Sequence, residues 1–262
     1  MTATSTEFCR EYARHRAEEG RAVRGAELKA LPYLRSGPLA SQWAVRAATF
    51  DAFVAHVANP AGSTGPLDIL DLGAGNGWLC NRMAQMGHRA VALDIRDDDV
   101  DGLGAAKDFL ADAPDLFKCV HASFDNLPFD DRSFDIALFN ASLHYAKELR
   151  CVLAEAARVT RHDGMVAILD SPFYFSEKDG AAMVAEKLAT GATRFGARAD
   201  VLLTPDFIEF LTPERLHTAS GTLAWSRRRV RYPFWYEMRP LVSWLRGRRK
   251  PSRFDLWTAR VP

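Results

Sequence analysis

Long apolar runs and a strong excess of charge of either sign are both missing from this chain of 262 residues. No run approaches the roughly 20 apolar residues that a helix needs to cross a bilayer. The chain has 34 basic and 33 acidic side chains, a formal net charge of only +1. The charge of the molecule as a whole therefore does not indicate binding to nucleic acid or to an anionic membrane. The first 20 residues lack the apolar core of a secretory signal. We therefore expect a soluble, cytoplasmic, globular protein.

Cysteine is scarce, and closely spaced cysteines are absent. Cys9, Cys80, Cys119 and Cys151 are scattered and form no C-x-x-C pair, which excludes a metal or redox centre built on such a pair. We expect four reduced and mostly buried thiols. The chain also lacks a zinc-site signature, a P-loop and the G-x-S-x-G motif, so the chemistry of those classes has no support.

The most informative stretch present covers residues 67–95. An apolar run of strand length ends at Leu72, and the glycine loop GAGNG follows at 73–77. A helical pattern then ends at Gly87, and a second apolar run closes on Asp94. This order of strand, glycine loop, helix, strand and terminal acid is typical of a nucleoside-binding βαβ unit.

Two nucleoside ligands compete for this unit. The dinucleotide motif needs a third glycine for close packing of helix on strand, but the position counted from Gly73 is Trp78. Asp71 stands two residues before the loop, where a carboxylate disfavours a pyrophosphate and suits an ammonium group. Asp94 can accept hydrogen bonds from two ribose hydroxyls. These residues favour S-adenosylmethionine, which carries an ammonium group and a ribose without phosphate, over NAD.

With these motifs the chain resembles the class I S-adenosylmethionine-dependent methyltransferases, in particular the small-molecule group called type 11. The resemblance covers roughly residues 67–170. The matching segments are 71–77, Asp94, 126–129, 133–137, 140–144, 158–164 and 168–170.

The alternation of strands and helices predicts a doubly wound α/β sheet. The resemblance adds that this Rossmann-like sheet has seven mostly parallel strands and an antiparallel last strand. We expect its later strands at 117–122, 134–139, 165–169, 221–231 and 254–261. Because ligands bind at the carboxyl ends of such strands, the segments that follow them should share one edge of the sheet.

The expected domain organisation has two parts. Residues 1–66 form a helical N-terminal extension, including a helix from Ser41 as N-cap to about Ala58. Residues 67–262 form the methyltransferase domain, in which the long aromatic-rich connection 171–214 is interpreted as a substrate lid. The alternative, that its aromatic side chains only form a satellite core, stays open. Residues 232–252 are a basic and aromatic insertion between the last two strands.

The resemblance also implies the residues that contact the cofactor. These are Asp71, Gly73, Ala74, Gly75, Asn76, Gly77, Asp94, Ile95, Ser123, Phe124 and Asn140. The chain departs from the family at Ser123, where an aspartate commonly reads the adenine amino group. A serine hydroxyl can still donate or accept a hydrogen bond there. Trp43 and Arg46 either pack in the core or lie beside the cofactor.

Methyl transfer is an in-line displacement that requires the nucleophile within roughly 3–3.5 Å of the methyl carbon. Some acceptors also need a base. His144 is the best placed candidate, and Tyr145 and Tyr174 are weaker candidates. The alternative is that His144 only bounds the substrate pocket or forms a hydrogen bond with a helix end. No metal is expected: the acidic run 97–101 has no histidine nearby, and we interpret it as the first turn of a helix.

We expect an S-adenosylmethionine-dependent methyltransferase that acts on a small molecule at oxygen, nitrogen or carbon. One alternative is a protein that binds the cofactor without transferring a methyl group, and another is an RNA or protein methyltransferase. Against the latter, Asn140 is not followed by the Pro-Pro-aromatic motif of enzymes that methylate adenine or glutamine.

The C-terminal segment 225–262 carries eleven basic and two acidic residues, a net charge of +9 that the rest of the chain offsets with −8. Basic and aromatic residues together suit an anionic acceptor, an anionic membrane surface or RNA. We favour an anionic or lipid-like small molecule, because RNA-binding motifs are absent. A solvated basic face over an apolar anchor is the alternative. The insertion should begin beside the substrate site.

Overall fold

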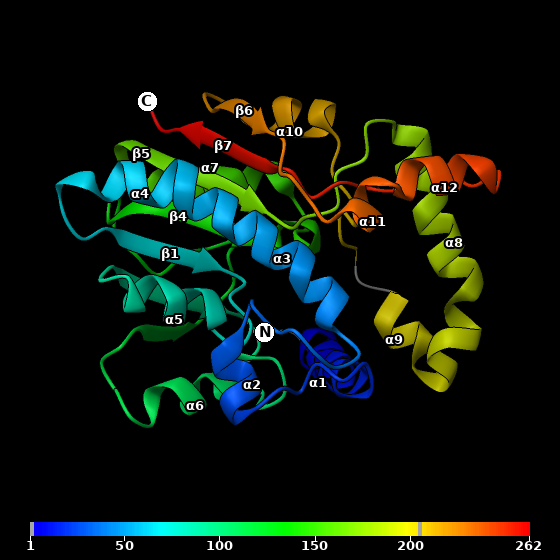
Figure 1. The fold of residues 1–262 in the computed structure, drawn as a ribbon, viewed down its shortest axis with the longest axis horizontal. Coiled ribbons are helices and arrows are strands. Elements are labelled where there is room, and N and C mark those ends of the chain that lie inside the picture. Colours follow the sequence, from blue (N-terminus) through cyan, green and yellow to red (C-terminus); the bar gives the residue numbers. More distant parts are fainter. Residues whose placement is uncertain (1–2, 204–205) are drawn as a thin grey trace.

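A seven-stranded sheet, covered by helices on both faces, forms the centre of the molecule (Figure 1). The computed structural model describes residues 3–203 and 206–262; the remaining residues, 1–2 of the expected extension and 204–205 of the expected lid, lie outside it. The strand order is β3-β2-β1-β4-β5-β7-β6. The strands are β1 (Asp68–Leu72), β2 (Arg89–Asp94), β3 (Lys118–His121), β4 (Phe134–Asn140), β5 (Thr160–Leu169), β6 (Ala224–Arg228) and β7 (Leu256–Arg260).

The pairing confirms the predicted Rossmann-like fold. Neighbouring strands from β3 to β5 are parallel, whereas β7 runs antiparallel to both β5 and β6. Strand β1 is buried on both faces: Ile69 belongs to one apolar cluster and Leu70 to the other. A parallel strand covered on both sides by helices needs apolar side chains in both directions, which explains Ile69, Leu70 and Leu72 in its sequence.

Twelve α-helices in the described part of the chain surround the sheet. They are α1 (Ala3–Glu18), α2 (Gly25–Ala30), α3 (Ala40–Phe53), α4 (Asn59–Ala61), α5 (Trp78–Gln85), α6 (Lys107–Leu110), α7 (Leu149–Val159), α8 (Glu177–Phe195), α9 (Ala199–Leu203), α10 (Pro213–Ala219), α11 (Phe234–Glu237) and α12 (Arg239–Leu245). None of the described helices combines the length and the apolar character that a membrane span requires.

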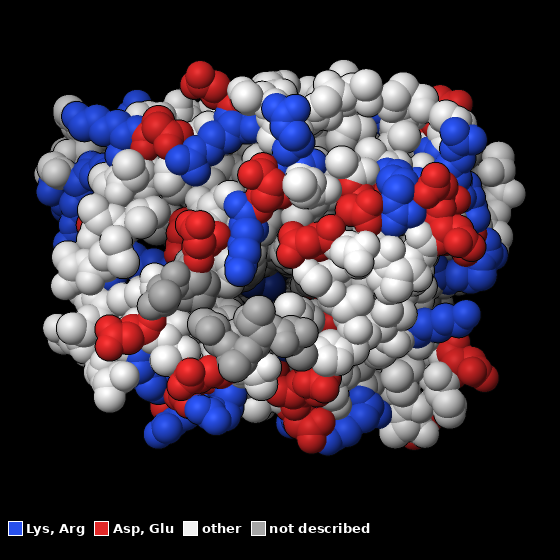
Figure 2. All heavy atoms as spheres, turned by 180° about the vertical axis from the view of Figure 1, so that it is seen from behind, with Lys and Arg blue, Asp and Glu red and all other residues white. Residues whose placement is uncertain are grey.

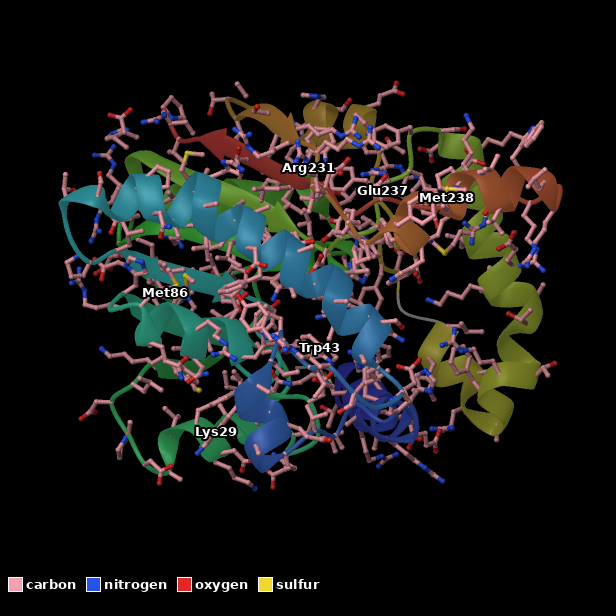
Figure 3. The ribbon with its side chains drawn as sticks, viewed as in Figure 1. Lys29, Trp43, Met86, Arg231, Glu237 and Met238 are labelled. Carbon is pink, nitrogen blue, oxygen red and sulfur yellow. The ribbon has the colours of Figure 1, made fainter. Side chains whose placement is uncertain are left out.

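Helix α3 differs from the prediction at its N-terminal end, whereas helical structure extends to Ala58 as expected. It begins at Ala40, with Leu39 as N-cap and no side-chain hydrogen bond, so Ser41 lies inside the helix. At its other end it continues into a π-helical turn, Val54–Ala58. The side chain of Trp43 points from α3 into the core (Figure 3), and its ring packs edge-on against Trp78 at 5.7 Å between centroids.

The acidic run 97–101 does not open a helix. Oδ1 of Asp98 accepts hydrogen bonds from the backbone N–H groups of Val100 and Asp101, at 2.9 and 3.0 Å. A short side chain that binds its own following backbone in this way competes with helix formation, and the next helical turn starts only at Leu103.

The expectation of mostly buried thiols was wrong. Only Cys80 is buried; Cys9 is half-buried, and Cys119 and Cys151 are exposed. Cys119 lies on the edge strand β3 and Cys151 on α7, and both point to solvent. All four cysteines are free.

The insertion 232–252 forms α11 and α12 and is anchored in the core by tyrosines. The Tyr232 hydroxyl donates to the carbonyl of Phe254 at 2.5 Å and lies 2.9 Å from the hydroxyl of Thr49 on α3. Tyr236 is buried beside Tyr232, with 4.4 Å between ring centroids. The insertion is therefore fixed to the body of the protein at its N-terminal end.

Candidate functional site

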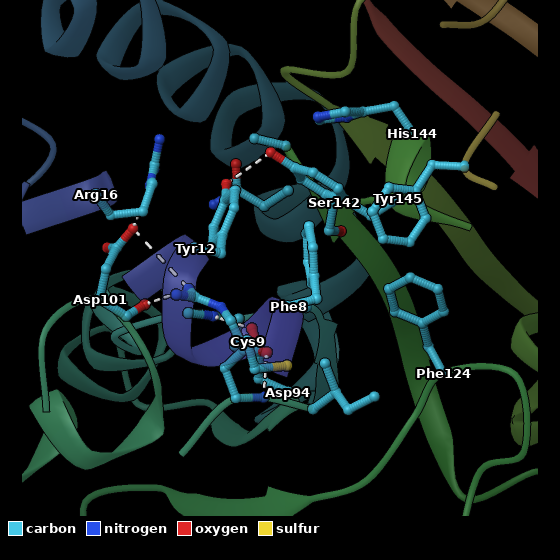
Figure 4. Close-up of a pocket in the computed structure, with 18 of the residues that line it drawn as sticks. Phe8, Cys9, Tyr12, Arg16, Asp94, Asp101, Phe124, Ser142, His144 and Tyr145 are labelled. Atoms are coloured by element: carbon cyan, nitrogen blue, oxygen red, sulfur yellow. Dashed lines mark hydrogen bonds and ion pairs between the residues drawn. The ribbon is translucent and has the colours of Figure 1, made fainter. Parts of the chain in front are cut away.

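A cavity of about 790 Å³ opens at the carboxyl ends of the parallel strands, and Figure 4 shows residues that line it. Its walls come from α1, α3, the glycine loop after β1 and the segments that follow β2, β3, β4 and β5. Parallel topology brings these segments together, because the carboxyl ends of all five strands lie at one edge of the sheet.

The glycine loop approaches its neighbours too closely for side chains. Gly73 and Gly75 have positive φ values of 78° and 55°, which favour glycine. A Cβ on Gly73 would collide with the side chain of Ser142, and one on Gly75 would lie 3.0 Å from the carbonyl of Asp101. The loop therefore presents bare backbone to the cavity.

Asp94, at the end of β2, is oriented by two backbone donors. The N–H of Gly75 donates to its Oδ2 at 2.7 Å, and the N–H of Arg96 donates to its Oδ1 at 2.8 Å. Burial raises the pKa of Asp94 despite the opposing charge of Arg96. Each oxygen keeps a free lone pair, so the carboxylate fits a pair of ribose hydroxyls in the cavity.

Asp71 is placed differently from the other predicted cofactor residues. It is fully buried, both of its carboxylate oxygens lack a hydrogen-bond partner within the described chain, and it is not among the residues that line the cavity. Burial, followed by repulsion from Asp94, raises the pKa of Asp71 well above its ordinary value. Gly77 does not reach the cavity wall either and acts through the shape of the loop, as the N-cap of α5.

Two polar groups in the cavity fit the amino-acid end of S-adenosylmethionine. Oδ1 of Asn140, at the end of β4, is buried without a partner among the described residues and can accept from an ammonium group. Arg46 forms no ion pair within the described chain, and its guanidinium lies 5.0 Å from the Trp43 ring centroid. Such a guanidinium can hold an α-carboxylate. The residues present therefore fit this cofactor.

The part of the cavity around Ser123 contains an acid that was not predicted from the sequence. The Ser123 hydroxyl donates to Oδ2 of Asp125 at 2.9 Å, and both residues line the cavity with Phe124 and Ile95. Asp125 therefore supplies a carboxylate close to the position where the family usually has one. The position of Asp125, two residues after Ser123, was the sequence feature that could have indicated this acid. The side chain of Asn76 forms hydrogen bonds with protein groups: its Oδ1 accepts from the N–H of Trp78, and its Nδ2 donates to Asp101.

Helix α1 contributes Phe8, Tyr12 and Arg16 to the cavity wall, which the sequence did not reveal. Nε of Arg16 donates to Asp101 at 3.0 Å, and Arg96 donates to the Asp101 carbonyl at 2.8 Å. The two guanidinium groups lie 5.6 and 5.0 Å from the ring centroid of Tyr12. Figure 4 shows Tyr12, Arg16 and Asp101 beside one another. Because α1 is far from the motifs in sequence, no local pattern indicated the contact between Arg16 and Asp101.

Both predicted catalytic residues line the far part of the cavity, where they retain their ordinary neutral forms. Burial, together with the charges of Arg46, Lys187 and Arg16, lowers the pKa of His144 to about 3, so its imidazole is neutral at physiological pH. Nδ1 of His144 is buried and has no partner in the described structure.

Tyr145 shares a hydrogen bond of 2.7 Å with the hydroxyl of Tyr12, and burial raises its pKa well above its ordinary value. It therefore keeps its proton. The weaker candidate Tyr174 does not line the cavity; its hydroxyl accepts a hydrogen bond from Arg249 at 3.0 Å.

Asp170, directly after β5, is a carboxylate in the cavity wall for which no role was predicted. Its backbone has a positive φ of 51°, and its Oδ1 is buried without a partner among described groups, as is the hydroxyl of Ser171. Burial raises the pKa of Asp170 to about 6, against the opposing effects of Arg46 and a hydrogen bond from Thr49. A positive φ and an unpaired buried carboxylate make Asp170 a candidate for a functional role.

None of residues 232–252, all of which the structure describes, lines the cavity. Strand β6 does run parallel to β1–β5, but the chain after it turns onto α3 and α8 rather than over the cavity mouth. The expectation that the insertion begins beside the substrate site is therefore not supported. In the described part of the chain, no group of three or more His, Cys, Asp or Glu side chains could hold a metal ion.

The comparisons with known proteins agree with this site. Residues 70–168 match the model of the Methyltransf_11 family, described as a methyltransferase domain. Malonyl-[acyl-carrier protein] O-methyltransferase of Buchnera aphidicola is 33% identical over 100 residues, which are 38% of each chain. A ubiquinone/menaquinone biosynthesis C-methyltransferase of Bradyrhizobium is 32% identical over 117 residues, 43% of this chain and 45% of that one. The chain thus spans less than half the length of these curated relatives.

A solved structure extends the similarity of the fold to the whole chain. Geranyl diphosphate C-methyltransferase of Streptomyces coelicolor, determined with Mg²⁺, geranyl diphosphate and S-adenosylhomocysteine, has a TM-score of 0.63 at 14% identity. The alignment covers 100% of this chain and 99% of that one. The chain therefore has the fold of the class I methyltransferases. Its segment 70–168 is similar to a methyltransferase domain.

Proposed function

We propose that the protein transfers the methyl group of S-adenosylmethionine to a small-molecule acceptor. The observation that carries the proposal is that one cavity is lined both by Asp94 with the glycine loop and by Asp170 with His144. The first group fits the cofactor, and the second offers buried polar atoms without a partner among the described residues to an acceptor.

Different residues along the cavity would bind different parts of the cofactor and the acceptor. Asp94 would hold the ribose, Asn140 the ammonium group and Arg46 the carboxylate, and the cofactor supplies the methyl group as a sulfonium. We assign the proton of the acceptor to Asp170, because a carboxylate with a pKa of about 6 is ionised at neutral pH and can accept a proton. His144, with its low pKa, forms part of the acceptor wall instead.

We propose a lipid-like acceptor, since the walls around the polar groups are aromatic. The contributing side chains are Phe8, Trp43, Phe124, Tyr145, Phe207 and Phe254. Relatives whose names specify acceptors as unlike as malonyl-[acyl-carrier protein], quinones and a sterol share the domain, so its motifs alone do not select one. The aromatic walls of this chain are the feature that favours an apolar body on the acceptor.

We also propose that α8 and α9, within the expected lid 171–214, cover the acceptor end together with α1. Val201 of α9 and Phe207 line the cavity. Lys187 of α8 pairs with Glu209 at 2.6 Å, and Arg194 of α8 pairs with Glu19 at 3.0 Å. These ion pairs cross between elements and can separate when the cavity opens.

Calorimetric titration with S-adenosylmethionine tests the cofactor end. We expect binding to the native chain and at least about tenfold weaker binding to Asp94→Ala, because charge-assisted hydrogen bonds to the ribose are lost. Asp97→Ala is the matched control: that carboxylate is exposed and should leave the affinity unchanged. Equal affinities for both variants would contradict the assignment.

Incubation with methyl-labelled cofactor and cell extract, followed by metabolite profiling, tests the transfer. We expect labelled product and S-adenosylhomocysteine to appear together. Tight cofactor binding without either product in any extract would instead support a binding protein that transfers no methyl group.

A further inference from the structure

Helices α11 and α12 expose a group of large apolar side chains to solvent. Figure 1 shows α12 at the outer edge of the molecule, beside one end of α8. The exposed fractions are Phe234 79%, Trp235 49%, Leu241 45%, Trp244 73% and Leu245 69%. Leu241, Trp244 and Leu245 have the spacing that places side chains on one face of a helix. These five residues are called the α11–α12 face.

Unpaired cations border the α11–α12 face in the sequence. Arg228, Arg231, Arg246, Arg248 and Lys250 are exposed, and none has a carboxylate partner among the described residues. In the insertion itself the sole acid is Glu237, which Arg229 and Arg253 bind at 3.1 and 2.9 Å. The face therefore combines apolar area with uncompensated positive charge.

The α11–α12 face is held rigidly away from the core. Tyr232 and Tyr236 anchor its first residues, and Figure 3 places Glu237 and Met238 where α11 meets α12. At the other end Arg249 pairs with Glu186 of α8 at 2.9 Å, and the N–H of Lys250 donates to Asp179 at 3.1 Å. With both ends fixed, the apolar side chains cannot fold back onto the protein.

We propose that the α11–α12 face binds the surface of an anionic phospholipid bilayer. Exposed tryptophan, phenylalanine and leucine enter the boundary between headgroups and acyl chains, while arginine and lysine pair with anionic headgroups. Nucleic acid would match the cations but not Leu241 and Leu245. A second copy would bring the same positive charge against itself. This proposal goes beyond methyl transfer and does not depend on it, because the face lies outside the cavity.

The test is sedimentation of the full chain with vesicles of phosphatidylglycerol and phosphatidylcholine, compared with vesicles of phosphatidylcholine alone. We expect binding to the anionic vesicles that weakens as salt rises, and little binding to the neutral ones. Trp244→Ser with Leu245→Ser, and separately Arg246→Ser with Arg248→Ser, should each weaken binding at least about tenfold. Because all four side chains are exposed, these variants should fold.

Matched controls remove the same chemistry elsewhere. Met86→Ser deletes an exposed apolar side chain distant from α12, and Arg35→Ser with Lys118→Ser deletes two exposed cations. Both controls should bind anionic vesicles like the native chain. Three outcomes would overturn the proposal: no vesicle binding, an equal loss in the controls, or a dimer in solution that disappears in the Trp244→Ser and Leu245→Ser variant.

Discussion

At the scale of single residues, the ionisation of Asp170 affects the free energy of unfolding and, in the proposed function, the acceptance of a proton. Its pKa in the folded chain is about 6, above the ordinary value of 3.8, so the folded state holds the proton more tightly than the unfolded chain. Ionising this buried carboxylate therefore costs folding free energy. The cost is absent below about pH 4 and complete above about pH 6.

Asp170→Asn should consequently stabilise the protein at pH 8 by at most about 3 kcal/mol, with no gain at pH 4. Asparagine also tolerates the positive φ. The same change should abolish turnover of an acceptor that must lose a proton, while cofactor affinity is unchanged. Thermal unfolding at the two pH values and the pH profile of kcat are the measurements.

Asp163→Asn is the control for Asp170→Asn, since Asp163 also has a positive φ of 62° but is exposed. It should change neither the stability nor the turnover. A native profile of kcat that does not fall as pH drops through about 6 would refute Asp170 as the base.

At the scale of elements, the packing of α8 depends on a glycine inside the helix. The space beside Gly180 is filled by the ring of Phe210, which also packs edge-on against Tyr174 and lies beneath the guanidinium of Arg215. A ring held on several sides cannot move away. At Gly191 the nearest atom is instead the free end of the Leu203 side chain, which can rotate.

Gly180→Ala should therefore destabilise the chain by up to about 2 kcal/mol, the net of an overpacking cost of ~1–3 kcal/mol and a helix-propensity gain of ~1 kcal/mol. Gly191→Ala should be neutral or stabilising. Urea unfolding measures both. If α8 covers the acceptor end, Gly180→Ala should also raise KM for the acceptor with unchanged cofactor affinity, and similar stabilities for the two variants would contradict this account.

At the scale of the whole molecule, the cofactor should stabilise the fold because its site is assembled from segments far apart in the sequence. At a concentration of 100 times its Kd, a ligand that binds only the folded state adds about 2.7 kcal/mol. For a chain of this size that shifts Tm by about 5–10 °C. We expect this shift in scanning calorimetry with S-adenosylhomocysteine. Asp94→Ala at the same ligand concentration should shift less, and no shift for the native chain would contradict the assembled site.

The sequence determined the class of fold and the cofactor because both depend on local patterns. Apolar runs of strand length, a glycine loop with positive φ at Gly73 and Gly75, and the acid Asp94 act within one βαβ unit of about 30 residues. The cap at Thr212, whose Oγ1 accepts from the N–H of Arg215, was predictable for the same reason. Such features are fixed by the chemistry of neighbouring residues.

Only the tertiary structure decided which residues complete the site and how they ionise. Arg16 of α1 reaches Asp101 across 85 positions of sequence, and no local pattern records that contact. A pKa depends on burial and on charges from other elements, so the pKa of His144 falls to about 3 and that of Asp170 rises to about 6. The exposure of a side chain also depends on packing against distant parts of the chain. The basic insertion was visible in the sequence, but only packing decided that its tyrosines are buried and that Trp244 faces solvent.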